Sequence, residues 1–317
     1  LLVLWAVGEL LTGDDDLIIR VLRIIFSPVI VIPGLAICAL RLKQHGERFR
    51  VQMVGKQFLT MRQEFARARN IHESMFPEPY DDTFVRFEYA YQPMRELGGD
   101  YVHARVSPQG LVHVTLIDVT GHGLAAALTV NRIYGELERI FGENPQTEPG
   151  EVLELLNRYI YLTLANHDIF ATAACFMLDP YMSRLTMANA GHPPAYLRGA
   201  NGVVTPLSAT TYMLGATGAT EFKANQRIIE MSPGDVMVCY TDGAFEGRDR
   251  LGTPLGLNSL EHLMHRQPPP RNWPQYITAA VEKHTAGRSE DDVLVASLSF
   301  LMPRSQETKV EQTLAVS

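Results

Sequence analysis

The chain has 317 residues, of which 46% are apolar and 20% are charged, and its formal net charge is −7 at neutral pH. This composition excludes a disordered or collagen-like chain, and a net acidic chain is a poor non-specific nucleic-acid binder because phosphate contacts need clustered Lys and Arg. Three scattered cysteines argue against a disulfide framework and a cysteine zinc site, and fit a reducing compartment. The charge is −2 on residues 1–40, +6 on residues 41–69 and −11 on the remainder, so we expect three segments with different roles.

Residues 1–41 are predicted to be a membrane-associated segment. Ile24–Leu40 carries no charged side chain, and as a helix its length of about 26 Å is near the lower limit for a membrane span. The basic residues that begin at Arg41 place the following chain in the cytoplasm by the positive-inside rule. We therefore expect a transmembrane helix in the inner membrane of the cell, with a buried or interfacial hairpin as the alternative. The chain begins at Leu1 and not at Met, which suggests that it is a fragment.

Residues 42–79 are predicted to form a linker helix. Apolar residues within 51–75 alternate spacings of three and four, which is the heptad pattern of a coiled coil. Two interpretations remain open: two copies pair into a homodimer through this stretch, or one amphipathic helix packs on its own domain. Pro77 and Pro79 are predicted to end the helix because proline cannot continue its hydrogen bonding.

Residues 80–302 are predicted to form the largest domain, followed by a disordered tail over residues 303–317. Alternating polarity predicts strands, and apolar periodicity over longer segments predicts helices. The expected strands are 84–92, 101–106, 111–118, 170–178, 184–188, 195–198, 226–230, 236–240 and 293–300, and the expected helices are 124–141, 150–166, 258–265 and 273–284. Because strands and helices come in blocks, we expect an α+β fold in which sheets pack together and helices lie outside.

Four acidic positions stand apart from the scattered surface charges of this domain. Asp100, Asp118 and Asp242 each lie where a strand meets a glycine-containing turn, and Asp291-Asp292 precede the last strand. Each aspartate alone is typical of the cap of a turn or helix. Together they predict a metal centre, because clustered carboxylates repel one another unless a cation neutralises them. Oxygen ligands of this kind suit Mg²⁺ or Mn²⁺.

Five short motifs occur in order along this domain: Glu96-Leu97-Gly98-Gly99-Asp100-Tyr101, Asp118-Val119-Thr120-Gly121-His122-Gly123, Ala190-Gly191-His192-Pro193-Pro194, Tyr240-Thr241-Asp242-Gly243 and Asp291-Asp292. Their order and spacing resemble the PPM family of metal-dependent serine/threonine phosphatases, in its bacterial sporulation stage II protein E branch. Residues 66–77 resemble the lead-in helix that is common in that branch. The resemblance therefore spans about residues 65–300.

The resemblance implies a four-layer α-β-β-α sandwich of two antiparallel sheets with flanking helices. It also implies a site for two Mn²⁺ or Mg²⁺ ions at one end of the sandwich. Carried over position by position, Asp118 would bridge both ions. Asp100 would bind one of them, together with the main-chain carbonyl of Val119.

By the same resemblance, Asp242 and Asp291 would bind the second ion, and Asp292 is the neighbour that could take the place of Asp291. The two ions would activate a water for attack on phosphorus, with Asp118 in the catalytic centre. The implied activity is hydrolysis of phosphoserine or phosphothreonine on a bacterial signalling protein, such as an anti-sigma-factor antagonist. His122 is a candidate proton donor to the leaving oxygen, and the alternative is that it only shapes its glycine turn.

Two positions depart from the family pattern. Val102-His103 stand where the family often has an aromatic residue and an aspartate, and Leu294 stands where it usually has a threonine. These departures leave open a weak or inactive phosphatase that serves as a binding module. Gly98-Gly99-Asp100 also suggests a diguanylate cyclase, but in that family an acidic residue and a phenylalanine follow, and the later aspartates would have no role.

Overall fold

The computed structural model describes residues 7–8, 16–94, 97–288 and 290–304. The chain divides into two compact units, Leu1–Ala66 and Arg67–Ser317, and each is described by itself. The predicted tail lies outside the described residues from residue 305 onward. So do Glu96 of the first motif and most of the chain before residue 16.

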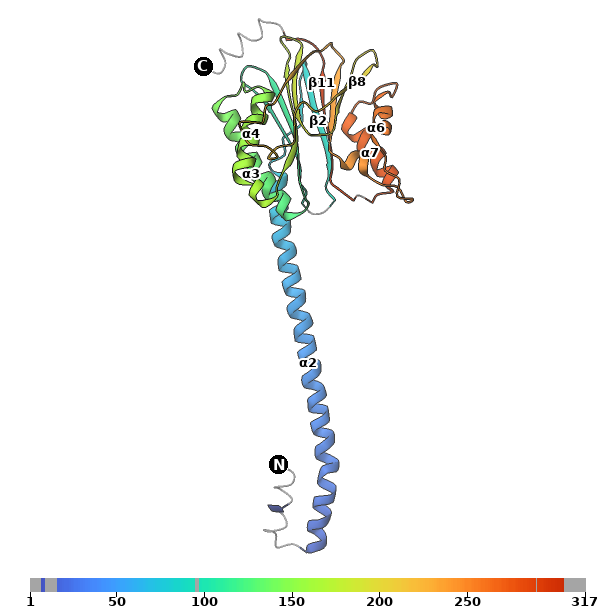
Figure 1. The fold of residues 1–317 in the computed structure, drawn as a ribbon. Coiled ribbons are helices and arrows are strands. Elements are labelled where there is room, and N and C mark those ends of the chain that lie inside the picture. The colour runs from blue at the N-terminus through green and yellow to red at the C-terminus, as the bar shows by residue number, and fades with distance from the viewer. Residues whose placement is uncertain (1–6, 9–15, 95–96, 289, 305–317) are drawn as a thin grey trace. The chain divides into compact units, whose positions relative to one another are not determined.

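One long helix, α2 (Leu17–Glu73), makes up most of the first unit (Figure 1). It runs without a break past Pro33 and Arg41, so the uncharged stretch and the basic stretch form one helix. We expected a membrane span at Ile24–Leu40. Within the described residues, no helix is both long enough and apolar enough to cross a membrane, so the expected span is not found there.

The helical part of the predicted linker is present as the later part of α2. In the first unit, the seam residues Val54, Phe58 and Met61 are 60%, 53% and 49% exposed. From Arg67 the helix belongs to the second unit, where His72 is buried. Packing on the chain's own domain is therefore seen in the last turns of the helix, and pairing of two copies through the exposed part stays a prediction.

The second unit contains two antiparallel sheets. The first sheet consists of β1 (Tyr80–Asp81), β2 (Val85–Gln92), β7 (Ala195–Arg198), β8 (Val204–Leu207), β10 (Val236–Tyr240) and β11 (Val293–Phe300), in the order β1-β2-β11-β10-β7-β8. The second consists of β3 (Asp100–Val106), β4 (Val112–Val119), β5 (Ala171–Asp179), β6 (Arg184–Ala190) and β9 (Arg227–Glu230), in the order β3-β4-β5-β6-β9.

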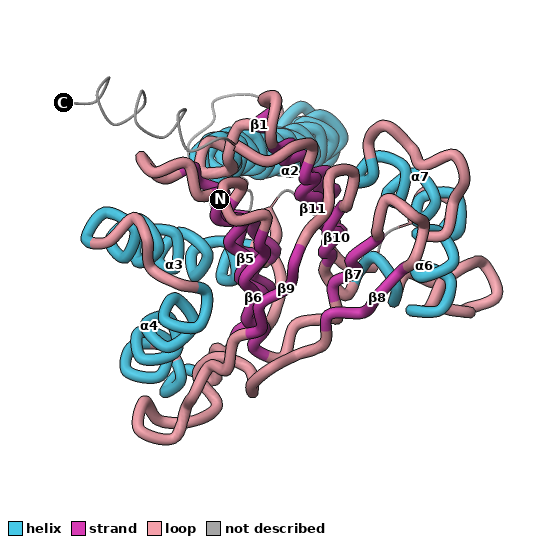
Figure 2. Tube along the Cα trace, turned by 90° about the horizontal axis from the view of Figure 1, so that it is seen from above, coloured by secondary structure: helices cyan, strands magenta, loops and turns pink. Residues whose placement is uncertain are grey.

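Helices cover the outer face of each sheet, as the view from above shows (Figure 2). The five-stranded sheet shares an apolar core with α3 (Leu124–Glu143) and α4 (Pro149–Thr163). The six-stranded sheet shares another core with α6 (Leu257–Met264) and α7 (Trp273–Thr285), and the short helices η1 (Ala165–His167) and α5 (Gly243–Glu246) complete the unit. The expected α+β fold with two antiparallel sheets and flanking helices is confirmed.

A third core lies between the two sheets and accounts for both apolar departures from the family pattern. Val102 of β3 and Leu294 of β11 are fully buried in this one cluster. Burial of each such side chain contributes about 1.5–3 kcal/mol. His103 points to the other face of its sheet, where Nε2 lies 2.9 Å from Oε1 of Glu138 in α3. Val102 and Leu294 therefore pack between the two sheets, and His103 links β3 to α3.

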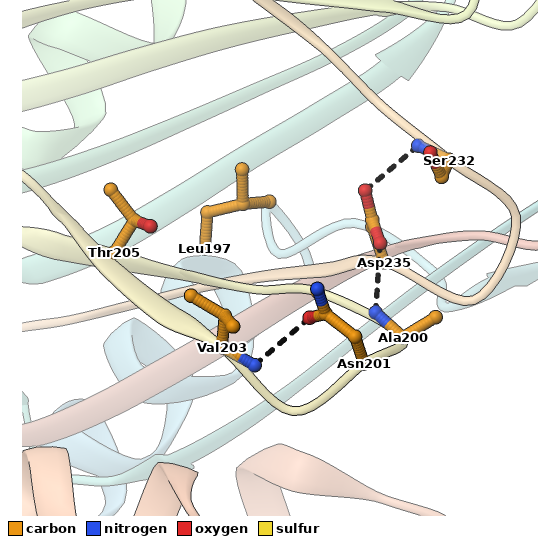
Figure 3. Close-up of a pocket in the computed structure, with 8 residues that line it drawn as sticks. Leu197, Ala200, Asn201, Val203, Thr205, Ser232 and Asp235 are labelled. Atoms are coloured by element: carbon orange, nitrogen blue, oxygen red, sulfur yellow. Dashed lines mark hydrogen bonds between the residues drawn. The ribbon is translucent and has the colours of Figure 1, made fainter.

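A pocket of about 340 Å³ lies beside the turn between β7 and β8 (Figure 3). The Asp235 carboxylate at its wall accepts hydrogen bonds from the backbone N–H groups of Ala200 (2.9 Å) and Ser232 (2.7 Å). Asp235 precedes β10 whereas Asp242 follows it, so the pocket lies at the opposite end of that strand from the predicted site. Because these hydrogen bonds shape two turns, we assign the pocket a structural role.

Candidate active site

Asp100 and Asp118 lie opposite each other at one end of the five-stranded sheet. Asp100 begins β3 and Asp118 lies next to the end of β4, and the antiparallel register pairs the two residues directly. Cross-strand partners carry their side chains on the same face of a sheet, with Cβ atoms about 5 Å apart. Asp100 is only 3% exposed. The fold therefore holds two carboxyl groups close together where water solvates them poorly.

The turn before Asp100 requires glycine because the end of β4 passes close to it. A Cβ atom on Gly99 would lie 2.9 Å from the carbonyl oxygen of Val119 and 3.2 Å from the Cβ atom of Ala126. The backbone N–H of Val119 also donates to the carbonyl oxygen of Gly99 at 3.3 Å. The carbonyl group of Val119, a predicted ligand, therefore lies next to the glycine turn that positions Asp100.

Asp242 and Asp291 lie at the ends of two paired strands in the six-stranded sheet. Asp242 follows β10 and precedes α5, and Asp291 lies just before β11. Gly243 allows the two segments to approach, because a Cβ atom there would lie 2.1 Å from the carbonyl oxygen of Asp292. Asp242 is half-buried and Asp291 is exposed. Each sheet therefore contributes two carboxylates.

The pKa values show that these four carboxylates interact across the two sheets. Burial, and after it the charge of Asp118, raises the pKa of Asp100 well above its usual range. Burial, and after it the charges of Asp242 and Asp291, raises the pKa of Asp118 to about 7. Asp242 has a pKa of about 6, raised by burial and then by Asp291. When all four are ionised, they repel one another.

These raised pKa values predict that the stability of the metal-free chain falls as pH rises. An unfolded aspartate loses its proton near pH 4, whereas folded Asp118 keeps its proton until about pH 7. Between those values the folded chain binds more protons than the unfolded chain, so its free energy of unfolding decreases as pH rises from about 4 to about 7. Urea unfolding across this range measures the decrease, which should be smaller in Asp118→Asn. An equal decrease in the two chains would contradict the raised pKa of Asp118.

The chemistry of this cluster fits a hard divalent cation. The Oδ2 atom of Asp100 is buried and has no hydrogen-bond partner among the described residues. The side chains of the cluster offer oxygen atoms, which Mg²⁺ and Mn²⁺ prefer. In the part of the chain that the structure describes, no group of three or more Asp, Glu, His or Cys side chains is already arranged to hold a metal ion. The oxygen atoms of the carboxylates at this end of the sandwich therefore fit such a cation.

Residues 108–300 match the family of stage II sporulation protein E (SpoIIE). The chain belongs to this family. Its sequence is 26% identical over 191 residues to phosphoserine phosphatase RsbP of Bacillus subtilis (strain 168), in an alignment that covers 59% of this chain and 46% of RsbP. The chain thus spans less than half the length of that SpoIIE-type relative.

Solved structures of PP2C domains have the same fold. The SiaA-PP2C domain of Pseudomonas aeruginosa superposes with a TM-score of 0.66 at 16% identity, covering 76% of this chain and 97% of that one. The PP2C phosphatase domain of SpoIIE from Bacillus subtilis, solved with a fragment of its regulatory domain, gives a TM-score of 0.59 at 18% identity, covering 71% and 64%. Membership of the SpoIIE family leaves the diguanylate cyclase alternative without support.

Within this SpoIIE fold, Asp291 and Asp292 have different surroundings. Asp292 is only 4% exposed. Its Oδ1 atom accepts a hydrogen bond from the backbone N–H of Met94, and its Oδ2 atom accepts one from that of Gly99, both at 2.8 Å. A Cβ atom on Gly98 would lie 2.1 Å from the same Oδ2 atom. Asp292 therefore stabilises the glycine turn, and each of its two carboxylate oxygens accepts one backbone hydrogen bond.

The two histidines of the SpoIIE motifs also differ in their surroundings. His122 is exposed and lies between two glycines with φ of 94° and 77°. Burial raises the pKa of Asp291, and His122 partly offsets this rise. His192 is buried, with Nδ1 lying 2.8 Å from Oγ1 of Thr172. Burial lowers the pKa of His192 to about 4, so its ring is neutral at neutral pH. His192 thus supports the structure, whereas His122 lies in the exposed turn that follows β4.

Thr241 was not among the predicted site residues, although it lies inside a SpoIIE motif. Thr241 is fully buried, and its Oγ1 atom accepts a hydrogen bond from the backbone N–H of Leu294 at 3.0 Å. Its hydroxyl also lowers the pKa of Asp100. Thr241 therefore supplies a hydroxyl next to the position where the family usually has a threonine. Its place directly before Asp242 was the available signal.

Proposed function

We propose that this chain is a metal-dependent protein phosphatase that hydrolyses phosphoserine or phosphothreonine on a bacterial signalling protein, such as an anti-sigma-factor antagonist. One observation carries the proposal: the carboxylates of Asp100, Asp118, Asp242 and Asp291 gather from two sheets and raise one another's pKa values. Membership of the SpoIIE family and similarity to a protein named phosphoserine phosphatase support the class of reaction.

The cluster offers ligands for two Mn²⁺ or Mg²⁺ ions. Asp118 would lie between the ions because it interacts with the carboxylates of both sheets. Asp100 and the carbonyl group of Val119 would complete one side, and Asp242 and Asp291 the other. Such an ion pair supplies Lewis acidity at the phosphoryl oxygens and a water activated for attack on phosphorus.

The surroundings of the two neighbouring aspartates favour Asp291 as the ligand. Asp292 is buried and accepts hydrogen bonds from the backbone N–H groups of Met94 and Gly99, which ties its carboxylate to the segment before Asp100. Asp291 is exposed, and its charge raises the pKa of Asp242. The hydrogen-bonded carboxylate of Asp292 would therefore hold the turn in place while Asp291 binds.

The exposed ring of His122 suits a role as proton donor to the leaving oxygen. An imidazole can give and take a proton near neutral pH, and the leaving serine or threonine oxygen needs one when the ester bond breaks. Burial raises the pKa of Asp291, and His122 partly offsets this rise, which supports a place for its ring near that carboxylate. The glycines on either side allow the turn that brings the ring there.

Removal of divalent cations is expected to lower phosphate release by at least about 100-fold, because the ions supply both the activated water and the charge stabilisation. The full chain is stripped with EDTA and assayed on a phosphoserine peptide, with and without added Mn²⁺ or Mg²⁺. Circular dichroism checks that the stripped chain stays folded. An equal rate without cation would contradict the proposal.

The same assay separates the phosphatase from an inactive binding module. That alternative was based on the departures at Val102 and Leu294, which both pack in the core between the sheets. A folded chain that binds Mn²⁺ and a phosphorylated protein but releases no phosphate would establish the binding module.

Two further proposals rest mainly on the sequence. One is attachment of residues 1–41 to the inner membrane, with the phosphatase unit in the cytoplasm. The other is a homodimer formed through residues 51–75, which the exposure of Phe58 and Met61 supports. Membrane fractionation of the full chain tests the first, and analytical ultracentrifugation at several concentrations tests the second.

A further inference from the structure

The hydroxyl group of Tyr91 is buried beside the acidic cluster. It has no hydrogen-bond partner among the described residues. Tyr91 lies near the end of β2 and pairs with Leu294 of β11. Its ring stacks on Phe76, with centroids 4.9 Å apart and an interplanar angle of 20°. The packed ring therefore fixes the direction in which the hydroxyl points.

The hydroxyl of Tyr91 and the carboxylate of Asp292 flank the same glycine. A Cβ atom on Gly98 would lie 2.2 Å from the hydroxyl oxygen and 2.1 Å from Oδ2 of Asp292. Burial raises the pKa of Tyr91, and the charges of Asp292 and Asp100 raise it further. Because Asp292 flanks the same glycine as the hydroxyl, its carboxylate is the acceptor that the geometry favours.

A phenylalanine would fill the same space without burying a polar group. A buried hydroxyl without a partner costs free energy, so it is expected to find an acceptor in some state of the protein. A hydrogen bond to a charged carboxylate is among the strong ones, and Asp292 already accepts one such bond from Gly99. A third donor at this carboxylate, in addition to Met94 and Gly99, would hold the glycine turn more firmly.

We propose that Tyr91 is a positioning residue of the metal site, whose hydroxyl donates a hydrogen bond to Asp292 when the carboxylates close around a cation. That bond holds the Gly98-Gly99 turn in place and with it Asp100, the residue that follows the turn. The inference rests on the proposed function, because it assumes that the cluster binds a cation.

The test compares Tyr91→Phe with Tyr89→Phe in the full chain. Tyr89 is a matched control because it lies on the same strand and also stacks on Phe76, with centroids 5.9 Å apart. Isothermal titration calorimetry measures the affinity of each chain for Mn²⁺. We expect Tyr91→Phe to bind Mn²⁺ about tenfold more weakly than the unaltered chain, as is usual when a group that orients a ligand is removed, and Tyr89→Phe to bind it equally well.

Urea unfolding without cation gives the second measurement. Tyr91→Phe is expected to be at least as stable as the unaltered chain there, because the hydroxyl has no partner in that state. A hydroxyl with a purely structural role would instead lower the stability on removal, whether or not Mn²⁺ is present. Phosphate release by Tyr91→Phe should fall at limiting Mn²⁺ and recover at saturating Mn²⁺.

Equal Mn²⁺ affinity in Tyr91→Phe and the unaltered chain would overturn the role of Tyr91 and leave the proposed function intact. A loss of stability in Tyr91→Phe without cation would overturn it as well. If the unaltered chain takes up no Mn²⁺, the proposed function fails and the inference fails with it, so the two failures are distinguishable.

Discussion

Asp118→Asn is expected to lower phosphate release at saturating Mn²⁺ by about 10³-fold. The substitution removes the carboxylate that interacts with the aspartates of both sheets and would lie between the two ions. Such ions contribute several kcal/mol of transition-state stabilisation, and each 1.36 kcal/mol corresponds to a tenfold change in rate. Initial rates on a phosphoserine peptide measure the loss.

Asp168→Asn is the matched control for this substitution. Asp168 is exposed and has φ of 56°, a backbone conformation that asparagine tolerates well. Its rate should stay within about twofold of the unaltered chain, as for surface substitutions in general. Removal of the repelling charge at Asp118 should not destabilise the metal-free fold, so urea unfolding can show that a lost activity is not lost structure. An undiminished rate in Asp118→Asn would remove Asp118 from the catalytic centre.

Gly243→Ala is expected to lower the free energy of unfolding by about 3 kcal/mol, which is at the upper end for overpacking in a dense region. The new Cβ atom would lie 2.1 Å from the carbonyl oxygen and 3.0 Å from the carbonyl carbon of Asp292. These are backbone atoms next to a paired strand, so they cannot move aside as a flexible side chain would. Urea unfolding of the full chain at neutral pH measures the change.

Gly135→Ala provides the control of opposite sign. Gly135 lies inside α3, where an added Cβ atom would meet nothing within 4 Å. Alanine is favoured over glycine in a helix interior by about 1 kcal/mol, so this variant should be more stable. If Gly243→Ala were as stable as the unaltered chain, this result would contradict the close approach of Gly243 to the backbone of Asp292.

The secondary structure of the second unit could be predicted largely from hydrophobic patterns. The strands expected at 236–240 and 293–300 coincide with β10 and β11, because both are strongly apolar and each adjoins a turn that contains aspartate. Strand β8 was not predicted from the sequence, because this edge strand is mostly exposed and contains Pro206. An edge strand needs no apolar alternation, so its sequence carries little signal.

The candidate site could be predicted only in part. The aspartates were identifiable because each lies at a strand end beside a turn. The difference between Asp291 and Asp292 was not, because it depends on hydrogen bonds from Met94 and Gly99, which are far away in the sequence. The role of Thr241 likewise depends on a strand pairing that brings Leu294 beside it. Contacts of this kind join residues that are far apart in the sequence, so local sequence patterns do not predict them.

The four carboxylates are divided equally between the two sheets, with Asp100 and Asp118 on one and Asp242 and Asp291 on the other. A cation shared by them would therefore crosslink the sheets across the apolar layer that separates them. Local opening of the sandwich at this end would break the crosslink, so the free energy of cation binding adds to the free energy of opening. Amide hydrogen exchange near the ends of β4 and β10 should then slow together when Mn²⁺ is added, although the two strands share no hydrogen bond.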